Sequence, residues 1–264
     1  MSAVANFHEP GFDLQQPFAA AIVIATIMRP SLGAALRSIF AQSFRGRTQI
    51  VIGIDKVVGD RAILADALKE RPPHQAVTVI DLGYSTALPN GGLHPDPWGG
   101  ALMTILSYAA NSRYVAYLDD DNWLGPRHLE TLLAAIDGKE WAFSLRWYVD
   151  GETRQPLCID EWESVGPGRG VYAESFGGFV DNSCLMIDKL ACEPALRLWS
   201  VPYPRQGGKH APADRSFFDG IRRRPFAGSG EATSFYAIQP SDTNHASRMA
   251  LIRERVALAA ANPR

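Results

Sequence analysis

The sequence predicts an α/β protein in which helices flank a mostly parallel central sheet. Short apolar runs rich in β-branched residues recur along the first half, and stretches with helical spacing separate them. Two of these runs end directly in carboxylates, at Asp55 and at the triplet Asp119–Asp121. With 264 residues, the chain can bury a core on both faces of such a sheet. Ligands bind open α/β sheets at the carboxyl ends of the strands, so that edge is the expected site.

The first half of the chain begins with a loose leader over residues 1–17 and then alternates strands and helices. The run Ala20–Ala25 is typical of a central strand covered on both faces. A polar turn, Thr26–Pro30, leads into a helix for which Ser31 is the expected cap. Further strands are expected at 49–55, 76–82 and 114–118, a Gly/Pro loop at 83–100, and helices at 61–70, 101–110 and from Gly125-Pro126 onward.

The second half has a different texture, with more aromatic residues and more glycine. Strands are expected at 141–149, 179–187 and 234–238, helices at 189–199, 214–223 and 246–261, a loop at 203–212 and a turn at 239–245. No repeat or clean linker divides the chain. We therefore expect one domain with a nucleotide-binding half over about 18–138, an acceptor and catalytic half over about 139–245, and a C-terminal helix over 246–264.

Composition excludes several classes of protein. A net charge of −2 and a pI near 6.3 do not suit an electrostatic nucleic-acid binder, and the Arg222–Arg224 cluster is too short to change that. The apolar stretch Ala19–Met28 is about half a membrane span, and the acidic leader is unlike a signal peptide. The odd set of cysteines, without zinc-ligand spacing, indicates buried thiols in a reducing compartment (Cys158, Cys184 and Cys192). The expected location is cytoplasmic.

The acidic triplet is the most informative motif. Three adjacent carboxylates repel one another, which raises their pKa values unless a cation compensates them. At a strand end, Asp119 and Asp121 share one direction because alternate side chains point to opposite faces. A hard divalent cation that carries a phosphorylated ligand is the simplest compensation. The alternative is that one Asp, or Asn122, caps the following turn while the other carboxylates are solvated.

The order of these features resembles the GT-A fold of nucleotide-sugar glycosyltransferases, and most closely family 2. That family has a first strand followed by a Thr-x-x-Arg-like turn, matched by Thr26–Pro30, and a second strand that ends in a base-contacting Asp, matched by Asp55. Its acidic DXD-type motif is similar to Tyr117–Asp121, followed by Pro126-x-x-Leu129. The triplet is also similar to that of inverting β-1,3-glucuronyltransferases, which carry an Arg-Pro after their first strand.

The resemblance implies roles for the residues at the acidic edge. Mn²⁺ or Mg²⁺ would be held by Asp121, with Asp119 and Asp120 shared between the metal shell and the ribose, and with His245 as an added ligand or a solvated turn residue. Nucleotide contacts are implied for Thr26, Arg29, Asp55, Asp119 and Asp120. An inverting transfer also needs a general base, and Asp214 occupies the implied position at a helix start. The alternative for Asp214 is an ordinary carboxylate favoured by the helix dipole.

Several other residues are candidates for lesser roles. Asp181 is the second candidate for the base, followed by Asp219 and Glu231. Trp147, Tyr148 and Asp181 are candidates for acceptor contact, although one of two adjacent strand aromatics usually faces the core. A clamp on diphosphate by Arg222–Arg224 would require the loop 203–212 to close over it.

The resemblance thus implies a metal-dependent, inverting glycosyltransferase that moves a sugar from a nucleotide sugar, with UDP favoured, to a saccharide or other hydroxyl acceptor. A retaining GT-A transferase and a sugar-phosphate nucleotidyltransferase are alternatives, but Thr26–Pro30 lacks the Gly-rich basic loop of the latter. A catalytically silent saccharide- or partner-binding module is a further alternative, because Trp98–Met103 lacks the Arg residues usual in family 2. An apolar stripe in the terminal helix could mediate oligomerisation (Met249, Ile252 and Val256).

Overall fold

The protein is described by a computed structural model that covers residues 3–96, 98–204, 210–240, 242 and 244–261. Ten strands of this part of the chain form one sheet in the order β1-β4-β3-β2-β5-β11-β7-β14-β6, with β8 paired to β7. The strands are β1 (Ala3–Phe7), β2 (Ala20–Thr26), β3 (Thr48–Ile54), β4 (Gln75–Asp81), β5 (Tyr114–Tyr117), β6 (Trp123–Leu124), β7 (Trp141–Asp150), β8 (Pro156–Ile159), β11 (Leu185–Asp188) and β14 (Phe226–Ile238).

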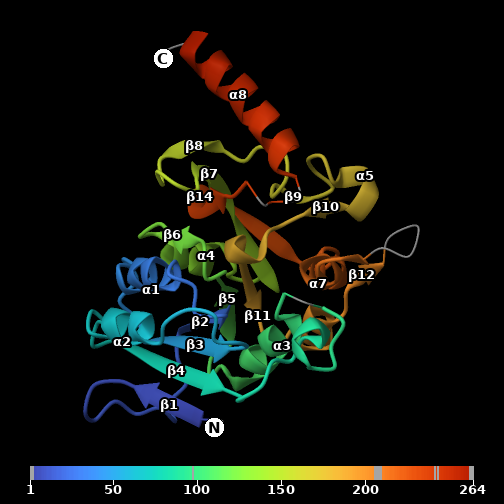
Figure 1. Cartoon of the computed structure of the whole chain (residues 1–264). Helices are drawn as coiled ribbons and strands as arrows, with labels where there is room; N and C mark the ends of the chain where they lie inside the picture. Colours follow the sequence, from blue (N-terminus) through green and yellow to red (C-terminus); the bar gives the residue numbers. More distant parts are fainter. Residues whose placement is uncertain (1–2, 97, 205–209, 241, 243, 262–264) are drawn as a thin grey trace.

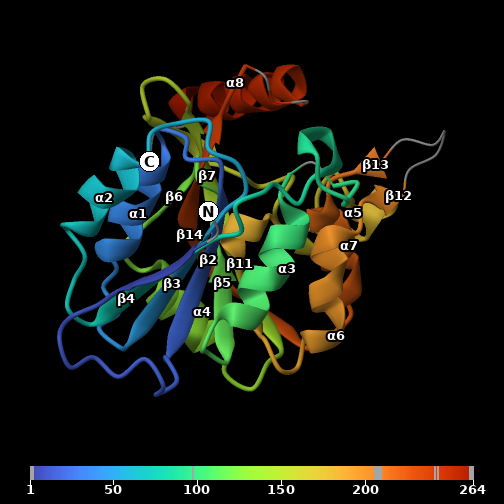
Figure 2. The same ribbon diagram turned by 60° about the horizontal axis from the view of Figure 1, so that its bottom comes forward.

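The predicted α/β class is confirmed, and helices cover both faces of the sheet (Figure 2). On one face, α1 (Leu32–Phe40), α2 (Ala62–Leu68) and α4 (His128–Ala135) share a core cluster with Ile22 and Ile24 of β2. On the other face, α3 (Gly100–Ala109), α6 (Glu193–Leu196), η3 (Arg197–Ser200) and α7 (Ala213–Ile221) pack with Ala21 and Val23. The alternation along β2 explains this, because successive strand residues point to opposite faces.

The four strands β4, β3, β2 and β5 are parallel neighbours whose carboxyl ends lie at one edge. Thr26 pairs with Ile54, so β2 and β3 end together, whereas Tyr117 pairs with Val23, so the acidic triplet that follows β5 runs alongside the end of β2. β11 then joins the two halves of the chain, because it is antiparallel to both β5 and β7. The long β14 runs parallel to β7. The sheet is therefore mixed rather than uniformly parallel.

Smaller elements complete the described chain. They are η1 (Leu88–Asn90), β9 (Gly166–Pro167), α5 (Ala173–Phe176), β10 (Gly178–Phe179), η2 (Asn182–Cys184), β12 (Tyr203–Pro204), β13 (His210–Ala211) and α8 (His245–Ala261). α8 projects from the body of the molecule at the end of the chain (Figure 1). Its Ile252 is buried and its Met249 packs against the same cluster, so part of the predicted apolar stripe contacts its own domain, whereas Val256 is exposed.

Several predicted boundaries were wrong. The leader is not loose throughout, because β1 pairs antiparallel with β4. The strand expected at 179–187 is interrupted by η2, where the Asp181 side chain accepts the N–H of Ser183 and turns the chain. The helix expected at 189–199 is divided between α6 and η3, and the last strand begins at Phe226 rather than Ser234.

Other differences are smaller. Ser31 stands at the N-cap position of α1 with helical dihedrals and makes no capping hydrogen bond. The loop expected at 203–212 contains β12 and β13, and its residues 205–209 lie outside the described part of the chain. The three cysteines are buried and unpaired, as predicted. Among the described helices, none combines the length and the apolar character that crossing a bilayer would require.

Candidate functional site

Asp120, the middle residue of the triplet, joins two strand ends in the interior. Its side chain is 2% exposed. Thr26 donates its hydroxyl to Asp120 Oδ2 at 2.6 Å, and Arg29 donates Nη1 to Asp120 Oδ1 at 2.5 Å. Thr26 Oγ1 also accepts the N–H of Met28 at 2.8 Å, which closes the turn after β2. The structure thus brings together three residues predicted for the site, and it uses Asp120 to hold the turn that carries Arg29.

Asp121 is more accessible to solvent than Asp120. Its side chain is 39% exposed, and its Oδ2 lies 3.5 Å from Arg29 Nη1. Burial and the charge of Asp120 raise the pKa of Asp121, although Arg29 acts in the opposite direction. Arg29 itself is half-exposed. A ligand approaching this edge therefore meets one carboxylate and one guanidinium that are both open to solvent.

Asp119 is oriented by a segment from the second half of the chain. Because β11 is antiparallel to β5, the residues just before β11 lie opposite those just after β5. Asn182 donates Nδ2 to Asp119 Oδ1 at 2.7 Å, and the N–H of Asp119 donates to Ser183 Oγ at 3.2 Å. Burial, followed by the charges of Asp181 and Asp121, raises the pKa of Asp119 well above its usual range. Neutralisation by a cation would relieve this repulsion.

The capping interpretation of the triplet is not supported by the contacts. α4 has Arg127 at its N-cap position and no side-chain cap. Asn122 instead donates to Ser183 Oγ at 3.3 Å, and its Oδ1 accepts the N–H of Ala237 at 3.1 Å. Asn122 therefore ties β14 to the acidic edge.

Asp214 lies in the first turn of α7, and the two oxygens of its carboxylate are not equally accessible to hydrogen-bond donors. Its Oδ1 is buried and makes no hydrogen bond with any part of the chain that the structure describes. Burial is the main cause that raises the pKa of Asp214 to about 6; Arg215 lowers it, and the charges of Asp181 and Asp96 raise it further. An ordinary helix-dipole carboxylate would have a lowered pKa, so this environment differs from the alternative interpretation.

The other candidates for the base are already paired. Asp181 accepts from Arg146 Nη1 at 2.6 Å and from the N–H of Ser183 at 3.0 Å. Asp219 accepts from Arg222 Nε at 2.7 Å on the surface. Glu231 pairs with Arg127 at 3.1 Å.

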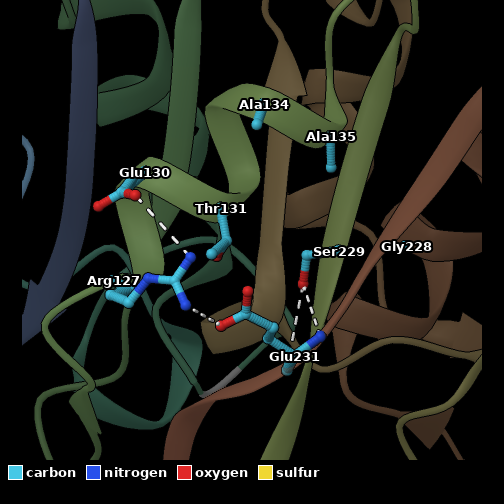
Figure 3. A pocket seen from close by; sticks show the side chains of 8 residues that line it. All are labelled: Arg127, Glu130, Thr131, Ala134, Ala135, Gly228, Ser229 and Glu231. Carbon is cyan, nitrogen blue, oxygen red and sulfur yellow. Dashed lines mark hydrogen bonds and ion pairs between the residues drawn. The ribbon is translucent and has the colours of Figure 1, made fainter.

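Glu231 lines a separate pocket, of about 340 Å³, between α4 and β14. Figure 3 shows Arg127 reaching both Glu130 and Glu231 there. No residue of the triplet lines this pocket. The pocket is thus distinct from the carboxyl edge where the acidic triplet lies.

Asp55 has both oxygens engaged in the structure. Ser85 donates its hydroxyl to Oδ2 at 2.7 Å, while Thr86 donates its N–H and its hydroxyl to Oδ1 at 2.9 and 3.1 Å. These bonds attach the loop after β4 to the end of β3. The predicted contact of Asp55 with a nucleotide base stays a prediction, and anchoring of this loop is a role that the sequence did not indicate.

His245 is the first residue of α8, and its Nδ1 lies 2.9 Å from the carbonyl oxygen of Gln239. Within the described ranges, no group of three His, Cys, Asp or Glu side chains lies close enough together to hold a metal ion. Asp119 and Asp121 nevertheless fit a hard divalent cation, because they supply oxygen ligands and their carboxylates repel each other. A metal role for these residues and for His245 stays a prediction.

The predicted acceptor aromatics differ in accessibility. Tyr148 is fully buried, and its hydroxyl donates to Glu163 at 2.8 Å while accepting from Arg146 at 3.1 Å. Its ring stacks on that of Trp162, with centroids 5.3 Å apart. Trp147, one residue earlier in the strand, is partly exposed. The structure therefore leaves Trp147 as the accessible member of the pair.

Two of the three arginines predicted to clamp a diphosphate, Arg222–Arg224, already form ion pairs within the protein. Arg222 pairs with Asp219, and Arg224 pairs with Glu140 at 2.7 Å. The loop that would close over it includes 205–209, which lie outside the described residues.

Two buried polar features were missed from the sequence. Asp96 is 2% exposed and accepts the N–H of Gly100 at 2.9 Å and that of Ala213 at 3.4 Å, so it connects the starts of α3 and α7. Arg146 is 1% exposed and pairs with three carboxylates. An arginine inside the mostly apolar run of β7 was the available signal for this cluster, since a fully buried Arg needs partners.

Comparison with known proteins identifies the fold. The sequence matches no protein-family model and no curated protein. Solved structures of S. aureus TarS do match it. TarS 1–349 has a TM-score of 0.57 at 12% identity over 83% of this chain and 60% of that one. Its complex with UDP-GlcNAc has a TM-score of 0.58 at 12% identity over 89% and 65%, and its complex with UDP has 0.55 at 13% over 89% and 64%.

The fold is GT-A-like. At this identity the likeness shows the fold alone, and this chain spans less than two thirds of the TarS chains it matches. The large central sheet flanked by helices is the architecture that the sequence predicts. The more specific likeness to glucuronyltransferases finds no support among these structures.

Proposed function

We propose that this protein is a metal-dependent inverting glycosyltransferase that moves a sugar from a nucleoside-diphosphate sugar to an acceptor hydroxyl. The observation that carries the proposal is that the candidate carboxylates of this GT-A-like fold have different electrostatic environments. Asp119 and Asp121 repel each other and favour a cation, whereas Asp214 has a raised pKa and a buried Oδ1 that makes no hydrogen bond within the described part of the chain. A similar fold solved with UDP-GlcNAc and with UDP supports a UDP-linked donor.

Asp121 and Asp119 would hold Mn²⁺ or Mg²⁺, with His245 as a further possible ligand. When bound, the ion supplies Lewis-acid neutralisation of the charge that develops on the leaving diphosphate. Arg29 is held by Asp120 with its guanidinium half-exposed, so it can donate to a phosphate oxygen. Thr26 and Asp55 complete the proposed nucleotide contacts.

Asp214 is proposed to act as the general base. The acceptor oxygen forms its bond to the anomeric carbon as the bond from that carbon to the diphosphate oxygen breaks, and the hydroxyl proton passes to Asp214. A pKa of about 6 leaves Asp214 ionised at neutral pH while keeping it basic enough to accept the proton. Trp147 is the accessible aromatic residue proposed for contact with a saccharide or other hydroxyl acceptor.

The cellular setting is proposed on independent grounds. Three buried, unpaired thiols favour a reducing compartment, and we propose the cytoplasm. If α8 mediates oligomerisation, as proposed, the contact would use its exposed Val256 rather than Ile252, which is already buried within the domain.

Thermal melting with nucleotides tests the donor and metal assignments together. We expect UDP with Mn²⁺ at about 100 times its Kd to raise the Tm by roughly 5–10 °C, more than GDP or CDP does. Asp121→Ala should abolish the metal-dependent part of this shift. Asp137→Ala, which removes an exposed carboxylate after α4, is the matched control and should behave as the wild type. The proposal fails if no nucleotide stabilises the wild type in Mn²⁺, or if Asp121→Ala keeps the full shift.

A further inference from the structure

A buried arginine at the centre of the second half holds three carboxylates at once. Arg146, in β7, donates Nε to Asp160 at 2.8 Å, Nη2 to Glu163 at 2.8 Å and Nη1 to Asp181 at 2.6 Å. All four side chains are nearly or completely buried. Despite burial, the pKa of Asp160 is lowered by Arg146 and by backbone N–H donors, so this carboxylate stays ionised.

A second arginine connects this cluster to the C-terminal helix. Arg248 of α8 donates Nε to Glu163 Oε2 at 2.9 Å, the same oxygen that accepts from Arg146. Its Nη1 also donates to Asp242 at 3.1 Å and to the Tyr236 hydroxyl at 2.9 Å. The N-terminal turn of α8 is therefore hydrogen-bonded to the Arg146 cluster.

The same cluster reaches the acidic edge through the η2 turn. Asp181 accepts from Arg146 with Oδ2 and from the N–H of Ser183 with Oδ1. Within this turn, Asn182 donates to Asp119 at 2.7 Å and Ser183 Oγ accepts the N–H of Asp119 at 3.2 Å. A continuous series of hydrogen bonds thus runs from α8 to Asp119.

Stability alone does not explain such a cluster. Buried ion networks are often no more stable than well-packed apolar residues of the same volume, whereas their geometry is highly directional. The planar guanidinium of Arg146 can satisfy three carboxylates only when each lies in its plane at the correct angle. Asp181, and the turn that follows it, are therefore restricted to one position.

We propose that Arg146 is a positioning residue for the candidate site, which acts through Asp181 and the η2 turn to orient Asp119, and that Arg248 makes α8 part of this support. The link to ligand binding rests on the proposed function, in which Asp119 contacts the metal and the nucleotide. The link to the η2 turn does not depend on any ligand.

Arg146→Lys and Arg248→Met test the two links of the network. Lysine keeps the charge but cannot bond three carboxylates in one plane, and methionine removes the outer donor while keeping the apolar stem. We expect the Kd of Mn²⁺ with UDP to rise about 10-fold in Arg146→Lys and by a few-fold in Arg248→Met. The control is Arg255→Met, which breaks the 2.7 Å ion pair between Arg255 of the same helix and Glu161, outside the network.

Hydrogen exchange provides a readout that needs no ligand. NMR can follow hydrogen exchange at the Ser183 backbone N–H and the Asn182 side-chain amide. Both groups should exchange faster in Arg146→Lys and Arg248→Met, whereas their exchange rates should stay at the wild-type values in Arg255→Met. If Arg146→Lys does not fold, Arg248→Met alone decides the outcome. The proposal is overturned if the folded variants keep wild-type exchange at Ser183, or if exchange rises while the Kd stays at the wild-type value. If the wild type itself binds no nucleotide, the proposed function fails, and the exchange rates still decide whether Arg146 positions the turn.

Discussion

Asp214 and Asp181 are chemically identical side chains whose partners give them different properties. Asp181 accepts hydrogen bonds from Arg146 and from the Ser183 N–H, whereas Asp214 Oδ1 is buried and has no such donor in the described part of the chain. A carboxylate whose two oxygens already accept hydrogen bonds from the protein has fewer free lone pairs with which to accept a bond from an acceptor hydroxyl. At the residue scale, this difference in environment favours Asp214 over Asp181 as the proposed base.

Asp214→Asn should separate stability from activity. We expect turnover to fall by roughly 10²–10⁴-fold, because the amide cannot accept the proton, while Mn²⁺–UDP binding persists. The folded pKa of Asp214, about 6, lies above the ordinary value of 3.8, so ionised Asp214 destabilises the fold, fully above pH 6 and not at all below pH 4. The variant should thus gain about 1–3 kcal/mol of stability at pH 8 and nothing near pH 4.

Urea unfolding at pH 4 and pH 8, together with single-turnover kinetics, measures both effects. In the wild type, the turnover rate should fall as the pH decreases through about 6. Retained turnover in Asp214→Asn would overturn its assignment as the base. The second candidate, tested as Asp181→Asn, should weaken nucleotide binding rather than remove only the chemical step, because Asp181 holds the η2 turn.

At the scale of elements, the loops at the carboxyl edge are attached to the strands by buried carboxylates. Asp55 attaches the loop after β4 to β3, and Asp96 attaches the start of α7 to the start of α3. Asp120 does the same for the turn after β2. The edge is therefore organised before any ligand binds, which reduces the ordering that binding would require.

Asp55→Ala should destabilise the protein by about 2 kcal/mol, because it leaves two donors of Thr86 and one of Ser85 without their acceptor in a buried place. Chemical denaturation checks the value. Asp150→Ala is a matched control, since Asp150 also accepts three hydrogen bonds, from two N–H groups and one hydroxyl, but at an exposed turn. We expect a clearly smaller destabilisation for the control, because water can replace the lost acceptor at an exposed turn. Equal effects in the two variants would contradict a buried anchor.

At the scale of the whole molecule, β11 joins the two halves of the sheet. Its Met186 pairs with Ala116 on one side and Ala142 on the other, and its side chain is fully buried. The candidate site contains residues from both halves, so its geometry depends on this junction.

Met186→Ala should destabilise both halves together, by about 2–5 kcal/mol, because it opens a cavity where they meet. Urea unfolding followed by far-UV circular dichroism and by tryptophan fluorescence should show one coincident transition at a lower midpoint. Leu190→Ala, close to β11 but 71% exposed, should change the midpoint little. Two separate transitions would show that the halves unfold independently, contrary to the single domain that the sequence predicts.

Much of the first half could be predicted because its signals are local. β2, β3, β4 and β5 are short apolar runs, and their carboxyl ends meet wherever helices connect parallel strands. The antiparallel insertion of β11 could not be predicted, since strand pairing is set by packing against distant segments rather than by the strand's own residues. The β1 edge strand was missed for the same reason.

By itself, the sequence determined the α/β class and the edge of the sheet at which Thr26, Asp55 and Asp119–Asp121 collect. Only the tertiary structure decided which carboxylates are paired and which are free. Asn182 contacts Asp119 across 63 residues, and Arg146 contacts Asp181 across 35. The charge state and orientation of a carboxylate depend on the donors and charges within a few ångströms, and here those neighbours come from distant parts of the chain.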